Sequence, residues 1–342
     1  MSATGLSTVS ATILGCAGPI LGAGEAAFFR DANPFGFILF GRNVETPDQL
    51  RRLTGDLRNS IGRDVPILID QEGGRVQRLR APHWREWLPP LDHVAAVAPA
   101  HLERSIWLRY RLIAAELRAA GIDANCAPSG DVATGATHPF LRNRCFSADP
   151  ATVIRAARAA ADGLMAGGVI PAVKHMPGHG RATLDSHLEL PRVRAGLDEL
   201  DTTDFAPFRA LADLPMGLTA HIVFEAVDPD LPATSSPLMV DLIRDRIGFG
   251  GLLLTDDLSM QALSGDLGQR AGAAIAAGCD IALHCNGKRE EMEPVIAGAG
   301  TLSPAAETRA LRALACRMAA EAIDTDLLEA EFEALLKEPA RG

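Results

Sequence analysis

The feature that most constrains the fold is an alternation of short apolar segments with longer stretches of helical periodicity. The apolar segments lack the strict polar alternation of half-exposed strands, which is typical of parallel strands buried on both faces. We predict eight strands, at 11–16, 36–40, 66–70, 123–127, 169–174, 217–222, 251–255 and 280–285. Eight strands alternating with helices predict an α/β fold, a (β/α)8 barrel of the TIM type, with a doubly wound open sheet as the alternative.

The helical stretches lie between these strands. The clearest is 150–166, where Asp149 is a suitable N-cap and Pro150 suits the first helical position. Further helices are expected at 47–61, 102–119, 203–213, 237–246 and 267–277, and the first connection, 24–31, is short. The sequence is mostly helical from residue 286 onward. We therefore expect a single barrel domain over 1–342, with 286–342 as a helical C-terminal extension packed on it.

Composition excludes several classes of function. A formal net charge of −10 argues against a general nucleic-acid binder, which needs a basic surface. No apolar run reaches the roughly 18 residues of a membrane helix, and the N-terminus lacks the basic start of a secretory signal, so we expect a cytoplasmic protein without a membrane partner. The six scattered cysteines form no CxxC pair, which predicts reduced, mostly buried thiols.

Polar and glycine-rich residues follow the predicted strands repeatedly. A single aspartate after a strand is more often a helix cap than a catalyst, but the carboxyl ends of barrel strands share one face, where active sites lie. Several charged residues on that rim therefore predict a site. The segments concerned are QEGGRVQRL after 66–70, HMPGHGRATLDSH after 169–174, DDLSM after 251–255, GRN after 36–40 and a histidine after 217–220.

The segment KHMPGHGRATLDSH, residues 174–187, leaves several chemistries open. His175, His179 and His187 could bind a metal, but their spacing matches neither HExxH nor a Cys/His finger. A phosphate loop would need a glycine-rich frame that is absent here. In an extended segment, Asp185 would point the same way as His187 and could raise its pKa, giving a proton donor near neutrality. A polar turn without chemistry is the remaining alternative.

Three motifs closely resemble those of family 3 glycoside hydrolases: DQEGGRVQRL (70–79), KHMPGHGRATLDSH (174–187) and TDDLSM (255–260). FGRN, RCFSADP and AHIVF fit the same pattern in the same order, and the resemblance extends from about residue 11 to 290. It is greatest to the single-domain bacterial β-N-acetylglucosaminidases of cell-wall recycling. Members of the family have a (β/α)8 barrel, in agreement with the strand count.

The resemblance implies a role for each matching residue. Asp256 corresponds to the nucleophile, His187 to the general acid/base and Asp185 to the residue that orients it. The positions that match sugar-binding residues are Asp70, Arg78, Arg144, Lys174 and His175. Strand alternation by itself does not choose between Asp256 and Asp257. We expect Asp257 to cap the next helix or support the pocket, Glu72 and Arg75 to brace a loop, and Asp131 to be a weaker candidate on the rim.

The function that the resemblance implies is retaining, exo-acting hydrolysis of terminal β-linked N-acetylglucosamine from 1,6-anhydro-muropeptides in peptidoglycan recycling. The expected partner is a small carbohydrate or muropeptide, with no metal or organic cofactor; the oligomeric state is open, and a monomer is compatible. One alternative is a β-glucosidase of the same family. Another is a phosphorylase, because a neutral imidazole repels incoming phosphate less than a carboxylate does. The third is a metal-dependent hydrolase.

Overall fold

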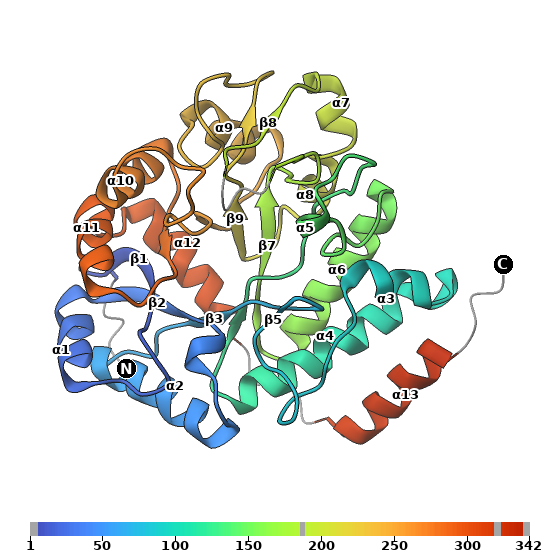
Figure 1. The fold of residues 1–342 in the computed structure, drawn as a ribbon, viewed down its shortest axis with the longest axis horizontal. Helices are drawn as coiled ribbons and strands as arrows, with labels where there is room; N and C mark the ends of the chain where they lie inside the picture. Colours follow the sequence, from blue (N-terminus) through green and yellow to red (C-terminus); the bar gives the residue numbers. More distant parts are fainter. Residues whose placement is uncertain (1–5, 185–188, 318–322, 338–342) are drawn as a thin grey trace.

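The structure is a computed structural model that describes residues 6–184, 189–317 and 323–337. Eight parallel strands form one sheet in the order β11-β9-β7-β6-β3-β2-β1-β12. A further parallel bridge, from Leu254 to Ile281, joins the two sheet edges and nearly closes a barrel (Figure 1). The strands are β1 (Ser10–Gly15), β2 (Pro34–Leu39), β3 (Ile67–Ile69), β6 (Ala124–Asn125), β7 (Ile170–Met176), β9 (Met216–Thr219), β11 (Leu252–Leu254) and β12 (Ala282–His284). The predicted barrel is confirmed, and the open sheet was the wrong alternative.

Each strand is buried on both faces. Ile13 and Leu14 of β1 are both fully buried, the first within the cluster inside the barrel and the second against the surrounding helices. Because neighbouring residues enter two different apolar environments, the strand sequences carry no polar alternation.

Helices surround the strands (Figure 1). Those between the first and the last strand are α1 (Ala23–Ala32), α2 (Pro47–Ile61), α3 (Pro90–Ala96), α4 (Leu102–Ala119), α5 (Pro139–Arg142), α6 (Pro150–Ala166), α7 (Leu197–Thr202), α8 (Ala206–Ala210), α9 (Pro237–Asp241) and α10 (Leu267–Ala277). The predicted bounds of α2, α4, α6 and α10 are confirmed. The Asp149 carboxylate accepts the Thr152 amide N–H at 2.9 Å, which is the expected N-cap of α6.

Two of the predicted helices differ from the structure. The segment 203–213 contains the short α8 instead of one long helix. The side chain of Asp204 is buried and pairs with Arg181, and α8 begins after it, with Pro207 in its first turn. The segment 237–246 begins as α9 and continues as a π-helical turn, η3 (Leu242–Arg246).

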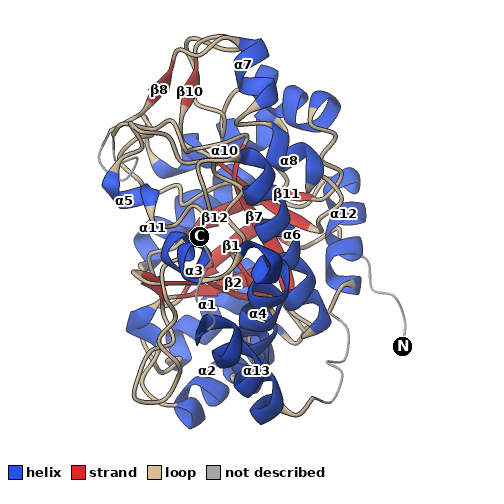
Figure 2. Ribbon diagram, turned by 90° about the vertical axis from the view of Figure 1, so that its right-hand side faces the viewer, coloured by secondary structure: helices blue, strands red, loops and turns tan. Residues whose placement is uncertain are grey.

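Smaller elements are inserted between the barrel strands, and three helices follow the last strand. The hairpin of β4 (Gln71–Gly73) and β5 (Val76–Gln77) follows β3, and β8 (Arg192–Val193) pairs with β10 (Val223–Phe224) at one end of the molecule (Figure 2). After β12 come α11 (Arg289–Ala299), α12 (Pro304–Ala315) and α13 (Thr325–Lys337), and α13 packs on α4. Within the described residues, no helix is long and apolar enough to cross a membrane.

Candidate active site

A pocket of about 230 Å³ opens at the carboxyl ends of the barrel strands. Its lining includes six of the predicted site residues: Asp70, Arg78, Arg144, Lys174, His175 and Asp256. They come from segments up to 186 positions apart in the sequence, and the barrel brings them together as the strand-end argument predicts. Asp185 and His187, the predicted acid/base pair, lie outside the described residues. Their roles therefore stay predictions.

One side of the pocket is a chain of alternating charges. The Lys174 Nζ donates to Asp70 Oδ1 at 2.7 Å and lies 2.6 Å from Glu72 Oε1. The Arg144 guanidinium binds both Glu72 oxygens, at 2.8 and 3.0 Å. At the other end, Arg78 donates to Asp70 at 3.0 Å. Glu72 was expected to brace a loop; in the structure it holds two of the predicted sugar-binding cations, Lys174 and Arg144.

The charges in this chain stabilise one another's ionised forms. Burial would raise the pKa of Asp70, but the cations of Lys174 and Arg78 lower that pKa well below its ordinary value. Likewise, burial opposes ionisation of Glu72, while Arg144 and Lys174 bring its pKa down to about 2. The pKa of the Lys174 ammonium is raised by the two carboxylates against the effect of burial. At neutral pH the pocket wall thus presents fixed charges and hydrogen-bonding groups to a polar ligand.

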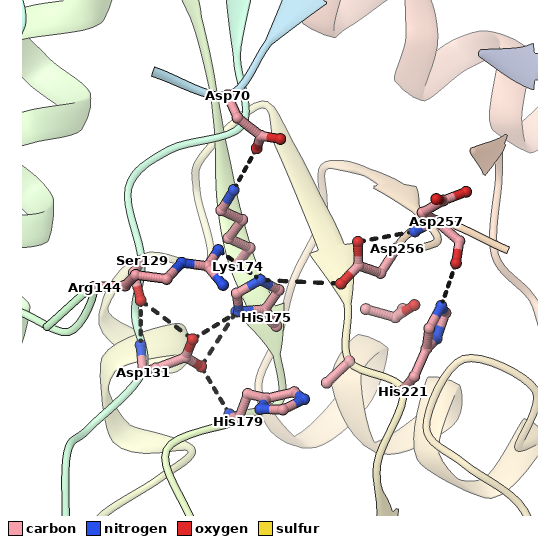
Figure 3. A network of polar contacts seen from close by, with 12 residues as sticks. Asp70, Ser129, Asp131, Arg144, Lys174, His175, His179, His221, Asp256 and Asp257 are labelled. Carbon is pink, nitrogen blue, oxygen red and sulfur yellow. Dashed lines mark hydrogen bonds and ion pairs between the residues drawn. The ribbon is translucent and has the colours of Figure 1, made fainter. Parts of the chain in front are cut away.

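Asp256 faces this wall across the pocket (Figure 3). Its Oδ1 accepts the Asp257 amide N–H at 2.8 Å, and its Oδ2 lies 4.0 Å from His175 Nε2. Burial would raise the pKa of Asp256, but the Asp257 amide that donates to it and the nearby Lys174 ammonium help to lower it below its ordinary value. The carboxylate is therefore ionised at neutral pH, which is the form that a nucleophile needs.

Asp257 supports the turn that carries Asp256. Its backbone carbonyl accepts the Nε2–H of His221 at 3.0 Å, and its carboxylate accepts from Ser259 and from the Cys285 amide. The next helix, α10, is capped by Asp266 instead. Of the two expected roles for Asp257, support of the pocket is the one observed. His221, part of the AHIVF motif, is thereby tied to the site indirectly.

Some lining residues were not singled out in the sequence. Phe140 lies on the rim, and the Arg75 guanidinium stacks 3.3 Å from the centre of its ring. Cys126, Leu218, Leu283 and Cys285 provide an apolar part of the lining. Leu218 and Leu283 lie within barrel strands near their carboxyl ends, and Cys126 and Cys285 directly follow strands, so a search of all strand ends would have found the apolar part. No local pattern marks Phe140.

Gly178 and Gly180 lie on either side of His179, and glycines in such a segment can give the backbone freedom to move. Both are buried, and their neighbours are close. A Cβ added to Gly180 would lie 1.8 Å from the Val132 carbonyl oxygen, while Gly178 has φ +139° and its amide donates to the His175 carbonyl at 2.7 Å. These glycines permit close packing and an unusual backbone conformation of 177–182 rather than giving it freedom.

The metal alternative required several ligands from the same segment. In the part of the chain that the structure describes, no group of three or more His, Cys, Asp or Glu side chains is arranged to hold a metal ion. The rings of His175 and His179 lie 5.5 Å apart. His187, the third predicted ligand, falls in the gap between 184 and 189.

The comparison with known families is consistent with this geometry. The sequence profile of the glycosyl hydrolase family 3 N-terminal domain matches residues 25–315, which is most of the chain. The chain belongs to glycoside hydrolase family 3. The resemblance inferred from the three motifs is therefore confirmed, and the match spans the strands that form the pocket from β2 to β12.

Similar proteins match this chain over two thirds or more of their own length. A β-hexosaminidase of Methylococcus capsulatus is 38% identical over 324 residues, covering 92% of this chain and 94% of the relative. A solved NagZ of Neisseria gonorrhoeae, in complex with N-trifluoroacetyl-D-glucosamine, superposes with a TM-score of 0.84 at 29% identity, covering 96% of this chain and 99% of that one. A family 3 β-N-acetylglucosaminidase of Paenibacillus sp. gives a TM-score of 0.86 at 28% identity, covering 98% of this chain and 68% of that one.

Proposed function

We propose that this family 3 enzyme is a retaining exo-β-N-acetylglucosaminidase with Asp256 as its nucleophile. The observation that carries the proposal is an ionised, partly buried Asp256 carboxylate that faces a wall of charged hydrogen-bonding groups in one pocket. The name of the Paenibacillus β-N-acetylglucosaminidase and the N-trifluoroacetyl-D-glucosamine bound to the Neisseria NagZ support N-acetylglucosamine as the sugar. We carry over the muropeptide aglycone and the cytoplasmic location from the resemblance to recycling enzymes.

The reaction proceeds by two displacements. Asp256 attacks the anomeric carbon and forms a covalent glycosyl-enzyme, while the glycosidic oxygen leaves with a proton from His187. His187 then takes a proton from water, which attacks the same carbon and releases Asp256. Two inversions give net retention. Because Asp257 holds Oδ1 of the Asp256 carboxylate, Oδ2 is the oxygen placed to react.

Sugar binding is assigned to the wall opposite the nucleophile. Asp70 and Lys174 are each held by oppositely charged neighbours, so their remaining lone pairs and protons point in fixed directions. Sugar hydroxyls both donate and accept, and can satisfy a carboxylate and an ammonium at once. A wall whose charges are already ordered loses little conformational entropy when it binds substrate.

The test compares release of nitrophenol from the β-N-acetylglucosaminide and the β-glucoside. We expect the wild type to hydrolyse the first far faster, Asp256→Ala to lose this activity, and Asp326→Ala, which removes an exposed acid on α13, to keep it. Azide should restore turnover to Asp256→Ala as the α-glycosyl azide. Preference for the glucoside would overturn the substrate, and full activity of Asp256→Ala would overturn the nucleophile.

The same assay tests His187 and the acceptor. General-acid help is typically worth ~10²–10⁴-fold. His187→Ala should therefore slow poor leaving groups far more than activated phenols, which need little protonation; equal losses would contradict the assignment. A glycosyl phosphate product in saturating phosphate would convert the proposal from a hydrolase to a phosphorylase.

A further inference from the structure

Asp131 lies in the loop after β6 and was a minor candidate in the sequence. Its carboxylate is fully buried and contacts four donors. Oδ2 accepts from His175 Nδ1 at 2.7 Å and from the Ser129 hydroxyl at 3.2 Å. Oδ1 accepts the backbone N–H of His179 at 2.7 Å and of His175 at 3.3 Å. Figure 3 shows Asp131 on one side of His175 and Asp256 on the opposite side.

This arrangement determines which nitrogen of the His175 ring carries the proton. A carboxylate can only accept hydrogen bonds, so Nδ1 must be protonated. On the other side of the ring, Nε2 lies 3.3 Å from Arg144 Nη2. A guanidinium can only donate, so Nε2 must be the acceptor. Both neighbours therefore require the same neutral tautomer, with a lone pair on Nε2 facing the pocket.

The same carboxylate also fixes the backbone that leads out of β7. The His179 amide is held by Oδ1, and the Gly178 amide is held by the His175 carbonyl at 2.7 Å. His175 and the start of the segment that continues toward His187 in the sequence thus share one anchor. Moving Asp131 would disturb the imidazole and this backbone together.

We propose that Asp131 is a positioning residue for the reaction: it sets the tautomer and orientation of His175 beside Asp256 and anchors the first residues after β7. This inference rests on the proposed function for its catalytic consequence. It assigns Asp131 no contact with the sugar. The hydrogen-bonding geometry itself exists without substrate and can be measured by itself.

The test measures the ¹⁵N shifts of the histidine rings in the full-length protein without substrate, with His175→Gln used to assign the signal. In the wild type we expect Nδ1 protonated and Nε2 bare. Asp131→Asn keeps the side chain's shape but turns an N–H₂ group toward Nδ1. If Asp131 rather than Arg144 sets the tautomer, the ring proton should move to Nε2 although the Arg144 contact remains. A wild-type ring protonated on Nε2 overturns the proposal, whether or not the variant folds.

Kinetics provide the second readout. Because misplacement of a reacting group by about 1 Å can cost ~10²-fold, we expect kcat/KM of Asp131→Asn to fall by about that factor. The matched control is Ser129→Ala, which removes one donor to Oδ2 and leaves the donors from His175 and His179; it should keep the wild-type tautomer and most of the activity. Equal losses in both variants, or an unchanged tautomer in Asp131→Asn, overturn the proposal. If the wild type hydrolyses neither glycoside, the proposed function fails, while the wild-type tautomer still decides the role of Asp131.

Discussion

At the scale of single residues, Glu72 is the buried carboxylate that holds two cations of the pocket wall, Lys174 and Arg144. Removing one partner of a buried ion pair leaves an uncompensated charge and typically costs ~3–5 kcal/mol. We therefore expect Glu72→Gln to lower the free energy of unfolding in urea by about this amount at pH 7. The control is Glu331→Gln, whose pair with Arg104 is exposed and worth at most about 1 kcal/mol.

The pH dependence of this loss has a definite sign. Glu72 has a folded-state pKa of about 2, below its ordinary value of 4.5. Its stabilisation is fully present above pH 4.5 and disappears as pH falls toward 2. The difference in stability between wild type and Glu72→Gln should shrink across that window. A difference that is constant with pH, or no larger than that of Glu331→Gln, would contradict the structural role assigned to Glu72.

Whether the role of a site residue could be predicted depends on how far along the sequence its partners lie. Asp70, Lys174 and Asp256 could be found because they end or follow apolar strands and lie in long motifs. The roles of Glu72 and Asp131 depend on Arg144 and His175, which are 72 and 44 positions away. Such pairings exist only after the barrel forms, so the sequence marked both acids as polar rim residues without showing what they hold.

At the scale of elements, the loop after β6 and the segment after β7 form one packed unit. The Val132 carbonyl lies against Gly180, and the Thr137 hydroxyl donates to the Gly180 carbonyl. Gly180→Ala would force the two segments apart, so we expect a large fall in kcat/KM with the fold retained by circular dichroism. Gly135→Ala is the control in the same loop, because its added methyl group meets no atom within 4 Å. Similar kinetics for Gly180→Ala and Gly135→Ala would contradict the prediction, because catalysis would then not depend on the close contact between the two segments.

The elements predicted best are those with a buried face on each side. All eight strands were found because each lies in a short, mostly apolar segment, and α2 and α6 were found because of their caps and periodicity. The pair β8 and β10 was missed because each strand has two residues, too few for any period to appear. The break between α7 and α8 depends on the contact of Asp204 with Arg181, which no local pattern shows.

On the scale of the whole molecule, the charges of the pocket lie at the mouth of the barrel, whereas α13 is held by the buried Phe332 and by exposed ion pairs such as Arg104–Glu331. Phe332 of α13 is 2% exposed and packs edge-on against Trp87, with ring centres 5.6 Å apart. Neither aromatic residue lines the pocket. Stability and catalysis should therefore respond separately to changes here.

Phe332→Ala tests this separation. Truncating a buried phenylalanine typically costs ~3–5 kcal/mol, through lost apolar burial and the cavity left behind. We expect the urea midpoint to fall accordingly, while kcat/KM of the folded variant stays close to wild type. Leu327→Ala, on the same helix but 68% exposed, should leave kcat/KM unchanged. It should change the free energy of unfolding by no more than the roughly 0.5 kcal/mol typical of surface sites. If kcat/KM falls in parallel with stability while the variant remains folded, then α13 shapes the pocket through the segment between β5 and α3, and stability and catalysis are coupled there.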